Sequence, residues 1–131
     1  MATLTQSKQN TLVQRMLQFD GLVEIALGAL LLVGAETVAD WFGISRTVVI
    51  GAGIFALAYA AFLFYIARGE VSRRTAWVVA LLNFDSALVI AIGLALAWGD
   101  LATDARWALA VVGDAVLLLS LAQMYVLRRT R

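Results

Sequence analysis

The sequence of 131 residues contains neither cysteine nor histidine. Without cysteine the chain can form no disulfide, no thiolate metal site and no thioether-linked haem, and it has no cysteine nucleophile. Without histidine it also lacks the commonest ligand of zinc, copper and haem iron, and the usual general base. We therefore expect no metal and no cofactor, and any chemistry has to rest on carboxylates, amides, hydroxyls and arginines.

Charged residues are also scarce, at 15% of the chain, whereas hydrophobic residues make up 63% and the mean hydropathy is +0.89. This balance lies well outside that of a soluble domain. The basic residues form no patch of the kind that binds nucleic acid. The composition predicts an integral membrane protein that contacts the lipid bilayer and binds no nucleic acid.

Four stretches of mostly apolar residues have the length of membrane-spanning helices, which need about 20 residues. Between a predicted cytoplasmic arm at 1–15 and a tail at 128–131, the predicted spans are residues 16–35, 47–67, 75–99 and 107–127. We therefore predict an all-α membrane protein with a single domain of four transmembrane helices. Residues 36–44, in the first loop, could form a short helix at the membrane interface.

The basic residues are divided unevenly between the two predicted sides of the membrane. Eight of the ten lie in the N-terminal arm, the second loop and the tail, whereas only Arg46 and Arg106 lie in the first and third loops. Loops rich in lysine and arginine stay on the cytoplasmic side. We therefore predict that both termini are cytoplasmic and that the protein resides in the inner (plasma) membrane.

An internal repeat is suggested by two pairs of similar segments. Residues 17–20 (LQFD) recur as 82–85 (LNFD), and residues 25–28 (IALG) recur as 90–93 (IAIG), at the same offset. This pattern predicts one two-helix hairpin used twice, with both copies in the same orientation. The alternative is a chance match between apolar segments of simple composition.

Small residues recur seven positions apart at equivalent places of the two predicted hairpins. These pairs are Gly21 and Gly28, Gly53 and Ala60, Ser86 and Gly93, and Gly113 and Ser120. Such spacing suits helices whose backbones approach closely. The alternative is that glycine and alanine are simply common in membrane helices.

Acidic residues within the predicted spans are the candidates for a functional site, because ionisable groups inside a membrane are costly to retain. Asp20 and Glu24 lie four positions apart and therefore share a helix face, close to Gly21 and Gly28. Burial and mutual repulsion would favour a protonated carboxyl there. Asp20, Glu24 and Asp85 are thus candidates for proton or ion coupling.

The same acids could instead form a structural clasp that fixes the helix register and transports nothing. Asp20 and Asp85 fall in the predicted cytoplasmic halves of their spans. Possible hydrogen-bond partners there are Arg15, Arg68, Arg128, Gln18, Asn83, Tyr65 and Tyr125. Glu24 has no acidic counterpart in the second hairpin, where Val89 is equivalent, and both interpretations stay open for it.

Asp114 is the acid of the last span, and its equivalent in the first hairpin is Ile54. An unpaired acid there is costly, so we expect it to face another helix or a partner protein. Arg106, two turns earlier, is a candidate ion-pair partner for it.

Two resemblances to known families can be stated. Residues 22–26 (LVEIA) resemble the segment around the essential glutamate of the small multidrug resistance transporters, which implies that Glu24 would bind protons and cationic drugs in competition. Residues 28–36 (GALLLVGAE) and 41–44 (WFGI), followed by a glycine-rich second span, resemble uncharacterised bacterial four-helix membrane proteins of the DoxX-like and domain-of-unknown-function sort. The second resemblance implies a fold, and it carries no activity across to this chain.

No phosphate-binding loop, nucleophile elbow or metal-binding spacing occurs in the sequence, so we expect no enzymatic activity. The sequence favours an accessory or interaction subunit, either homo-oligomeric or attached to a larger membrane protein complex. The alternative is a proton-coupled small-molecule transporter or channel that works as an oligomer. Glu24 distinguishes the two: a wet cavity around it favours transport, and burial against arginine or tyrosine favours a clasp.

Overall fold

The computed structural model describes residues 2–129, with side chains from residue 10 onward. Within this range the chain forms five helices: α1 (Ala2–Val33), α2 (Ala35–Phe42), α3 (Arg46–Ile66), α4 (Arg73–Ala97) and α5 (Thr103–Arg129). All but α2 are long and apolar enough to cross a membrane. The predicted all-α fold with four candidate transmembrane helices is confirmed, and it indicates a multi-pass membrane protein.

The largest difference from the predicted boundaries concerns the N-terminal arm. Residues 1–15 were expected to precede the first span, and α1 is one continuous helix from Ala2 that runs through them into that span. Residues 2–15 contain no glycine or proline, so nothing in them interrupts a helix. The predicted tail likewise continues α5 as far as Arg129, whereas residues 1 and 130–131 lie outside the described range.

The short helix expected at residues 36–44 is present as α2, and local hydrogen bonds fix the helix ends around it. Gly43 ends α2 in the left-handed conformation (φ 62°), which glycine adopts without steric cost. Ser45 then caps α3 by accepting a hydrogen bond from the Val48 amide, at 3.4 Å. Ala35 and Ala39 of α2 pack on Val49 of α3, so α2 is held against the hairpin.

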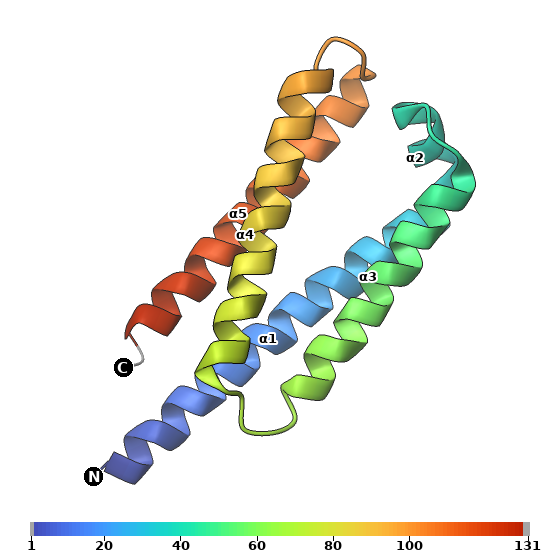
Figure 1. Ribbon diagram of the computed structural model, residues 1–131. Helices are drawn as coiled ribbons and strands as arrows, with labels where there is room; N and C mark the ends of the chain where they lie inside the picture. Colours follow the sequence, from blue (N-terminus) through green and yellow to red (C-terminus); the bar gives the residue numbers. More distant parts are fainter. Residues whose placement is uncertain (1, 130–131) are drawn as a thin grey trace.

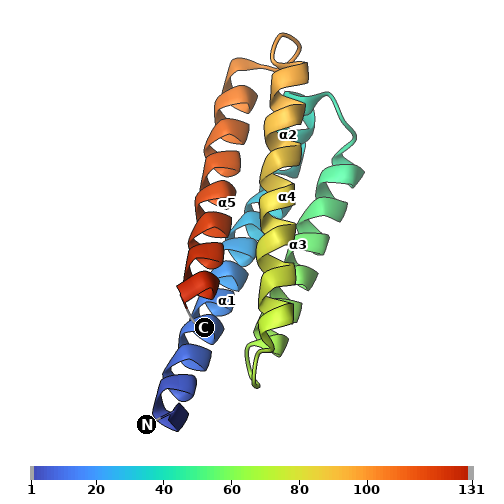
Figure 2. The same cartoon turned by 60° about the vertical axis from the view of Figure 1, so that its left-hand side comes forward.

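The four long helices form two antiparallel hairpins, α1 with α3 and α4 with α5 (Figures 1 and 2). Both chain termini and the α3–α4 loop lie at one end of the molecule, which we call the terminal end. Helix α2 and the α4–α5 loop lie at the other, the α2 end. Which end faces the cytoplasm stays a prediction from the charge distribution.

Two glycines allow α1 and α3 to approach closely. A Cβ atom added to Gly28 would lie 3.0 Å from the Gly53 carbonyl oxygen, and one added to Gly53 would lie 3.1 Å from the Gly28 carbonyl oxygen. The predicted close packing of small residues therefore holds for this hairpin. It does not hold on α4, where Gly93 faces open space and Ser86 is exposed.

The two hairpins meet through an apolar cluster at the terminal end. Its buried members, drawn from all four long helices and the residue after α3, are Val13, Leu17, Leu63, Ala67, Ala76, Val79, Ala80 and Leu127. Polar contacts reinforce this end. The Gln14 side chain donates to the Gly69 carbonyl at 2.7 Å, and Arg73 donates to the Leu127 carbonyl at 2.7 Å. The apolar cluster thus joins the two hairpins at the end where the termini lie.

Candidate functional site

One buried polar cluster joins both hairpins, and we call it the Asp20 cluster. Asp20 of α1 accepts hydrogen bonds at its Oδ2 from Asn83 Nδ2 of α4 at 2.7 Å and from Gln123 Nε2 of α5 at 3.0 Å. Asn83 Nδ2 also donates to Gln123 Oε1 at 3.1 Å. The exposed fractions of Asp20, Asn83 and Gln123 are 1%, 5% and 0%. A closed set of hydrogen bonds therefore joins α1 of the first hairpin to α4 and α5 of the second.

Helical periodicity places each member of the Asp20 cluster on the same face as the apolar cluster. Asp20 follows Leu17 by three residues, Asn83 follows Ala80 by three, and both spacings return the chain to the same side of its helix. Gln123 precedes Leu127 of α5 by four residues, with the same result. The polar groups thus form the next layer of the core towards the α2 end.

The Asp20 cluster pairs one carboxyl acceptor with two amide donors. A carboxylate accepts hydrogen bonds, and both amide side chains present their NH₂ groups to it. Amide donors lower the cost of keeping a carboxyl in an apolar interior, because buried polar groups are expensive only when they lack partners. Asp20 thus hydrogen-bonds to Asn83, which is one of the partners considered from the sequence, and to Gln123, which is not.

Gln123 is the member of the cluster that the sequence analysis missed. A signal was available, because an amide inside an apolar span needs a hydrogen-bond partner for the same reason that an acid does. The search for candidates in the last span had considered its acid and its arginines and had left Gln123 out.

Glu24 lies one turn beyond Asp20 on the same face of α1, and its side chain is half-buried. Within the described part of the chain it makes no hydrogen bond or ion pair. Tyr59 of α3 is close enough to both carboxyls to interact with them electrostatically. The Tyr59 hydroxyl is buried and has no hydrogen-bond partner among the described residues. Glu24 is thus neither engaged by arginine nor fully enclosed.

Asp85, the predicted counterpart of Asp20, occupies a different environment. Its side chain is exposed, and it takes no part in the Asp20 cluster. The residue of α4 that faces Asp20 is Asn83, two positions earlier. Two positions turn a helix by about 200°, so the matching segments LQFD and LNFD present opposite sides to the core. The expectation of equivalent clasps at Asp20 and Asp85 is wrong.

Asp114 is also exposed, near the middle of α5. The expected ion pair with Arg106 is not formed. Arg106 Nε instead donates to the Leu101 carbonyl at 2.8 Å, and its guanidinium carbon lies 5.6 Å from the centre of the Trp98 ring. The arginine thus stabilises the α4–α5 loop and leaves the acid without that partner.

The remaining predicted residues lie on the surface of the terminal end. Arg68, Arg128, Tyr65 and Tyr125 are all exposed, and none of them contacts Asp20 through a hydrogen bond. The guanidinium carbon of Arg129 lies 4.6 Å from the centre of the Tyr125 ring, a cation–π contact. These side chains do not form the clasp that the sequence analysis considered for them.

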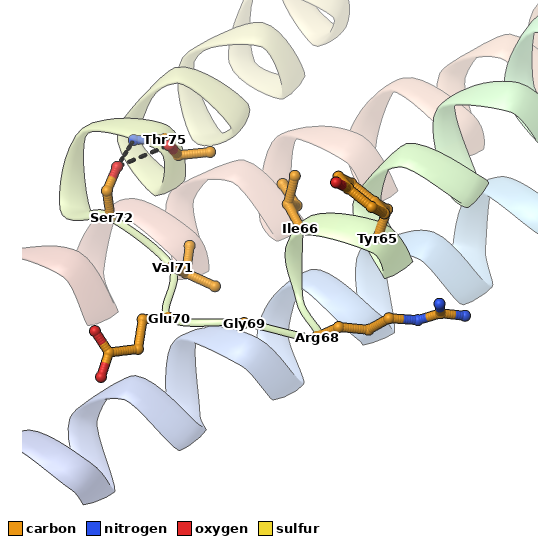
Figure 3. A pocket seen from close by; sticks show the side chains of 8 residues that line it. All are labelled: Tyr65, Ile66, Arg68, Gly69, Glu70, Val71, Ser72 and Thr75. Atoms are coloured by element: carbon orange, nitrogen blue, oxygen red, sulfur yellow. Dashed lines mark hydrogen bonds between the residues drawn. The ribbon is translucent and has the colours of Figure 1, made fainter.

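An open hollow of about 490 Å³ lies at the α3–α4 loop, lined by Tyr65, Ile66, Arg68, Gly69, Glu70, Val71, Ser72 and Thr75. Figure 3 shows the side chains of Arg68 and Glu70 extending in opposite directions. The Ser72 hydroxyl is already engaged, because it accepts from the Thr75 amide at 3.0 Å and caps α4. The charged groups of Arg68 and Glu70 therefore do not converge on a common point in this hollow.

Comparisons of the chain with models of protein families, with characterised proteins and with solved structures find no match. The resemblances to small multidrug resistance transporters and DoxX-like proteins thus stay predictions. In the part of the chain that the structure describes, no three acidic side chains gather in a way that could hold a metal ion. The function has to be argued from the placement of the intramembrane polar groups.

Proposed function

We propose that this protein is a non-enzymatic membrane subunit that assembles with other membrane proteins. The observation that carries the proposal is the exposure of Asp85 and Asp114 near the middle of apolar helices α4 and α5. An aspartate at the centre of a span costs about 2.5–3.5 kcal/mol to insert. A binding partner that supplies a hydrogen bond or a charge relieves this cost, which gives assembly a driving force.

The Asp20 cluster supports the same proposal. Asp20 was one of the candidates for a proton carrier, but its carboxylate accepts hydrogen bonds that join α1 to α4 and α5. A rigidly held bundle with polar groups left on its outer surface suits a binding role.

Assembly is tested by the size of the protein in native membranes. We expect the tagged chain, produced at its natural level in the organism that encodes it and extracted with its surrounding lipid, to run well above its own mass of 14.1 kDa. The double variant Asp85→Asn, Asp114→Asn should shift the protein towards monomer. Native mass spectrometry of the extracted particles gives the readout. A monomeric wild type would contradict the proposal.

A second candidate function, proton-coupled transport or conduction by an oligomer, rests on Glu24 and Tyr59. Glu24 is half-buried without a hydrogen-bond partner in the described structure, and the buried Tyr59 hydroxyl beside it is also unpartnered. Two such groups could exchange a proton or hold a small cation between α1 and α3. One four-helix bundle is too thin for a cavity with two gates, so this function requires more than one copy.

The transport function predicts a flux that depends on Glu24. In proteoliposomes with an imposed pH gradient, Glu24→Gln should abolish proton-driven uptake or efflux about as completely as omission of the protein. Glu36→Gln, which removes an exposed acid outside the four candidate spans, should leave the flux unchanged. The absence of any gradient-dependent flux by the wild type, tested with protons and with organic cations, would exclude this candidate.

A further inference from the structure

A shallow groove runs between α4 and α5 on the α2-end side of the Asp20 cluster. Its volume is about 120 Å³, and its lining is almost entirely apolar apart from Asp114. Two small lining residues, Ala91 and Ala110, are at least partly exposed, whereas Ala87 is buried and Gly113 packs against Ile90 of α4. Small side chains let a neighbouring helix bring its backbone close, which is how helices associate within lipid.

The charge of Asp114 restricts what can fill the groove. A purely apolar helix would seal the carboxylate against hydrocarbon without offering it a hydrogen bond, which is costly in a medium that contains no water. A helix with a lysine or arginine at the same depth would instead supply a charge-assisted hydrogen bond. The complementary occupant is therefore a transmembrane helix that carries one basic residue near its middle.

A second copy of this chain does not meet that requirement. None of its ten lysine and arginine residues lies in the central turns of a spanning helix. Arg106, the basic residue nearest to Asp114 on the N-terminal side of α5, precedes it by eight positions (114 minus 106). At the rise of an α-helix this is about 12 Å along the axis. The groove therefore calls for a helix from a different protein.

We infer that the α4–α5 groove binds a transmembrane helix of another membrane protein, with a central lysine or arginine of that helix paired to Asp114. The inference rests on the proposed function and names the class of partner that such a subunit would bind. The small residues provide the close approach, and the carboxylate provides selectivity over the lipid acyl chains that otherwise cover this surface.

A synthetic helix tests the inference without knowledge of the natural partner. The probe is a transmembrane peptide of leucine and alanine with one central lysine, and the reference is the same peptide with leucine in its place. Association with the dye-labelled protein is measured by energy transfer in phosphatidylcholine vesicles. We expect the lysine peptide to bind wild type about tenfold more tightly than the reference, equivalent to about 1.4 kcal/mol.

Four variants locate the contact. Asp114→Asn should remove the preference for the lysine peptide, whereas Asp104→Asn, which replaces an exposed acid of α5 outside the groove lining, should keep it. Ala91→Leu should weaken binding of both peptides because the larger side chain fills the groove. Ala58→Leu, an exposed position on α3, is the matched control and should bind like wild type.

Three results would overturn the inference. These are equal binding of the two peptides by wild type, retention of the preference in Asp114→Asn, and Asp114-dependent association between two copies of this chain. If either of the first two occurred while the native particle still exceeded the monomer mass, the proposed function would stand and the partner would bind elsewhere. The third result would make a second copy of this chain the partner. A monomeric native particle would remove the proposed function itself.

Discussion

Replacement of Asp20 by alanine is expected to lower the free energy of unfolding by about 2–4 kcal/mol, because each buried donor left without an acceptor costs about 1–3 kcal/mol. The two donors concerned are the side-chain amides of Asn83 and Gln123, which both point at Asp20 Oδ2. They lie on the second hairpin, so the loss should loosen the contact between hairpins before either one unfolds. Reversible unfolding in mixed detergent micelles, followed by circular dichroism, measures the effect.

The predicted repeat provides a matched control for this expectation. Asp85→Ala removes an acid from the equivalent sequence position, but that acid is exposed and makes no contact with the cluster, so little stability should be lost. Asp20→Asn retains an oxygen acceptor and should recover most of the stability that alanine loses. Equal losses for Asp20→Ala and Asp85→Ala would show that the buried hydrogen bonds are not what holds the hairpins together.

Replacement of Gly28 by leucine is expected to destabilise the protein by about 1–3 kcal/mol, the usual cost of forcing extra atoms into a packed interface. A Cβ atom at this position meets the Gly53 carbonyl oxygen at 3.0 Å, and this backbone atom of α3 moves only if the whole helix moves. The same unfolding measurement applies. Cross-linking between cysteines placed at exposed positions of α1 and α3 should also become slower as the helices separate.

Gly93→Leu is the control for the packing argument, since Gly93 is the predicted repeat equivalent of Gly28 and faces open space. We expect no loss of stability there, because the new side chain extends into the surroundings and meets no neighbouring helix. A similar loss in both variants would mean that leucine disturbs these helices for a reason other than the close approach of α1 and α3.

The position of Glu24 follows from the way in which the hairpins meet. The apolar cluster joins the two hairpins at the terminal end, and the Asp20 cluster joins them one layer further towards the α2 end. At the α2 end itself, α2 contacts α5 of the second hairpin. Glu24 lies one turn beyond Asp20 on the same face of α1, and its side chain is half-buried. This arrangement leaves room for both proposed functions and explains why Glu24 separates them experimentally.

The fold class, the four candidate spans and the short helix after the first span could all be predicted from the sequence. These features depend on local properties. In lipid a backbone has to satisfy its own hydrogen bonds, so an apolar stretch of about 20 residues can only be a helix. Hydropathy marks where a helix becomes apolar and does not mark where the helix begins, so the predicted first span starts later than α1 does.

Which polar residues are buried depends on how the helices pack against one another. The segments LQFD and LNFD are nearly identical, yet the core receives Asp20 from the first and Asn83 from the second. Sequence periodicity fixes which residues share a helix face, but the rotation of each helix about its own axis is set by packing against the other helices. For the same reason the partnership of Gln123 with Asp20, and the exposure of Asp85 and Asp114, became visible only when all four long helices were placed together.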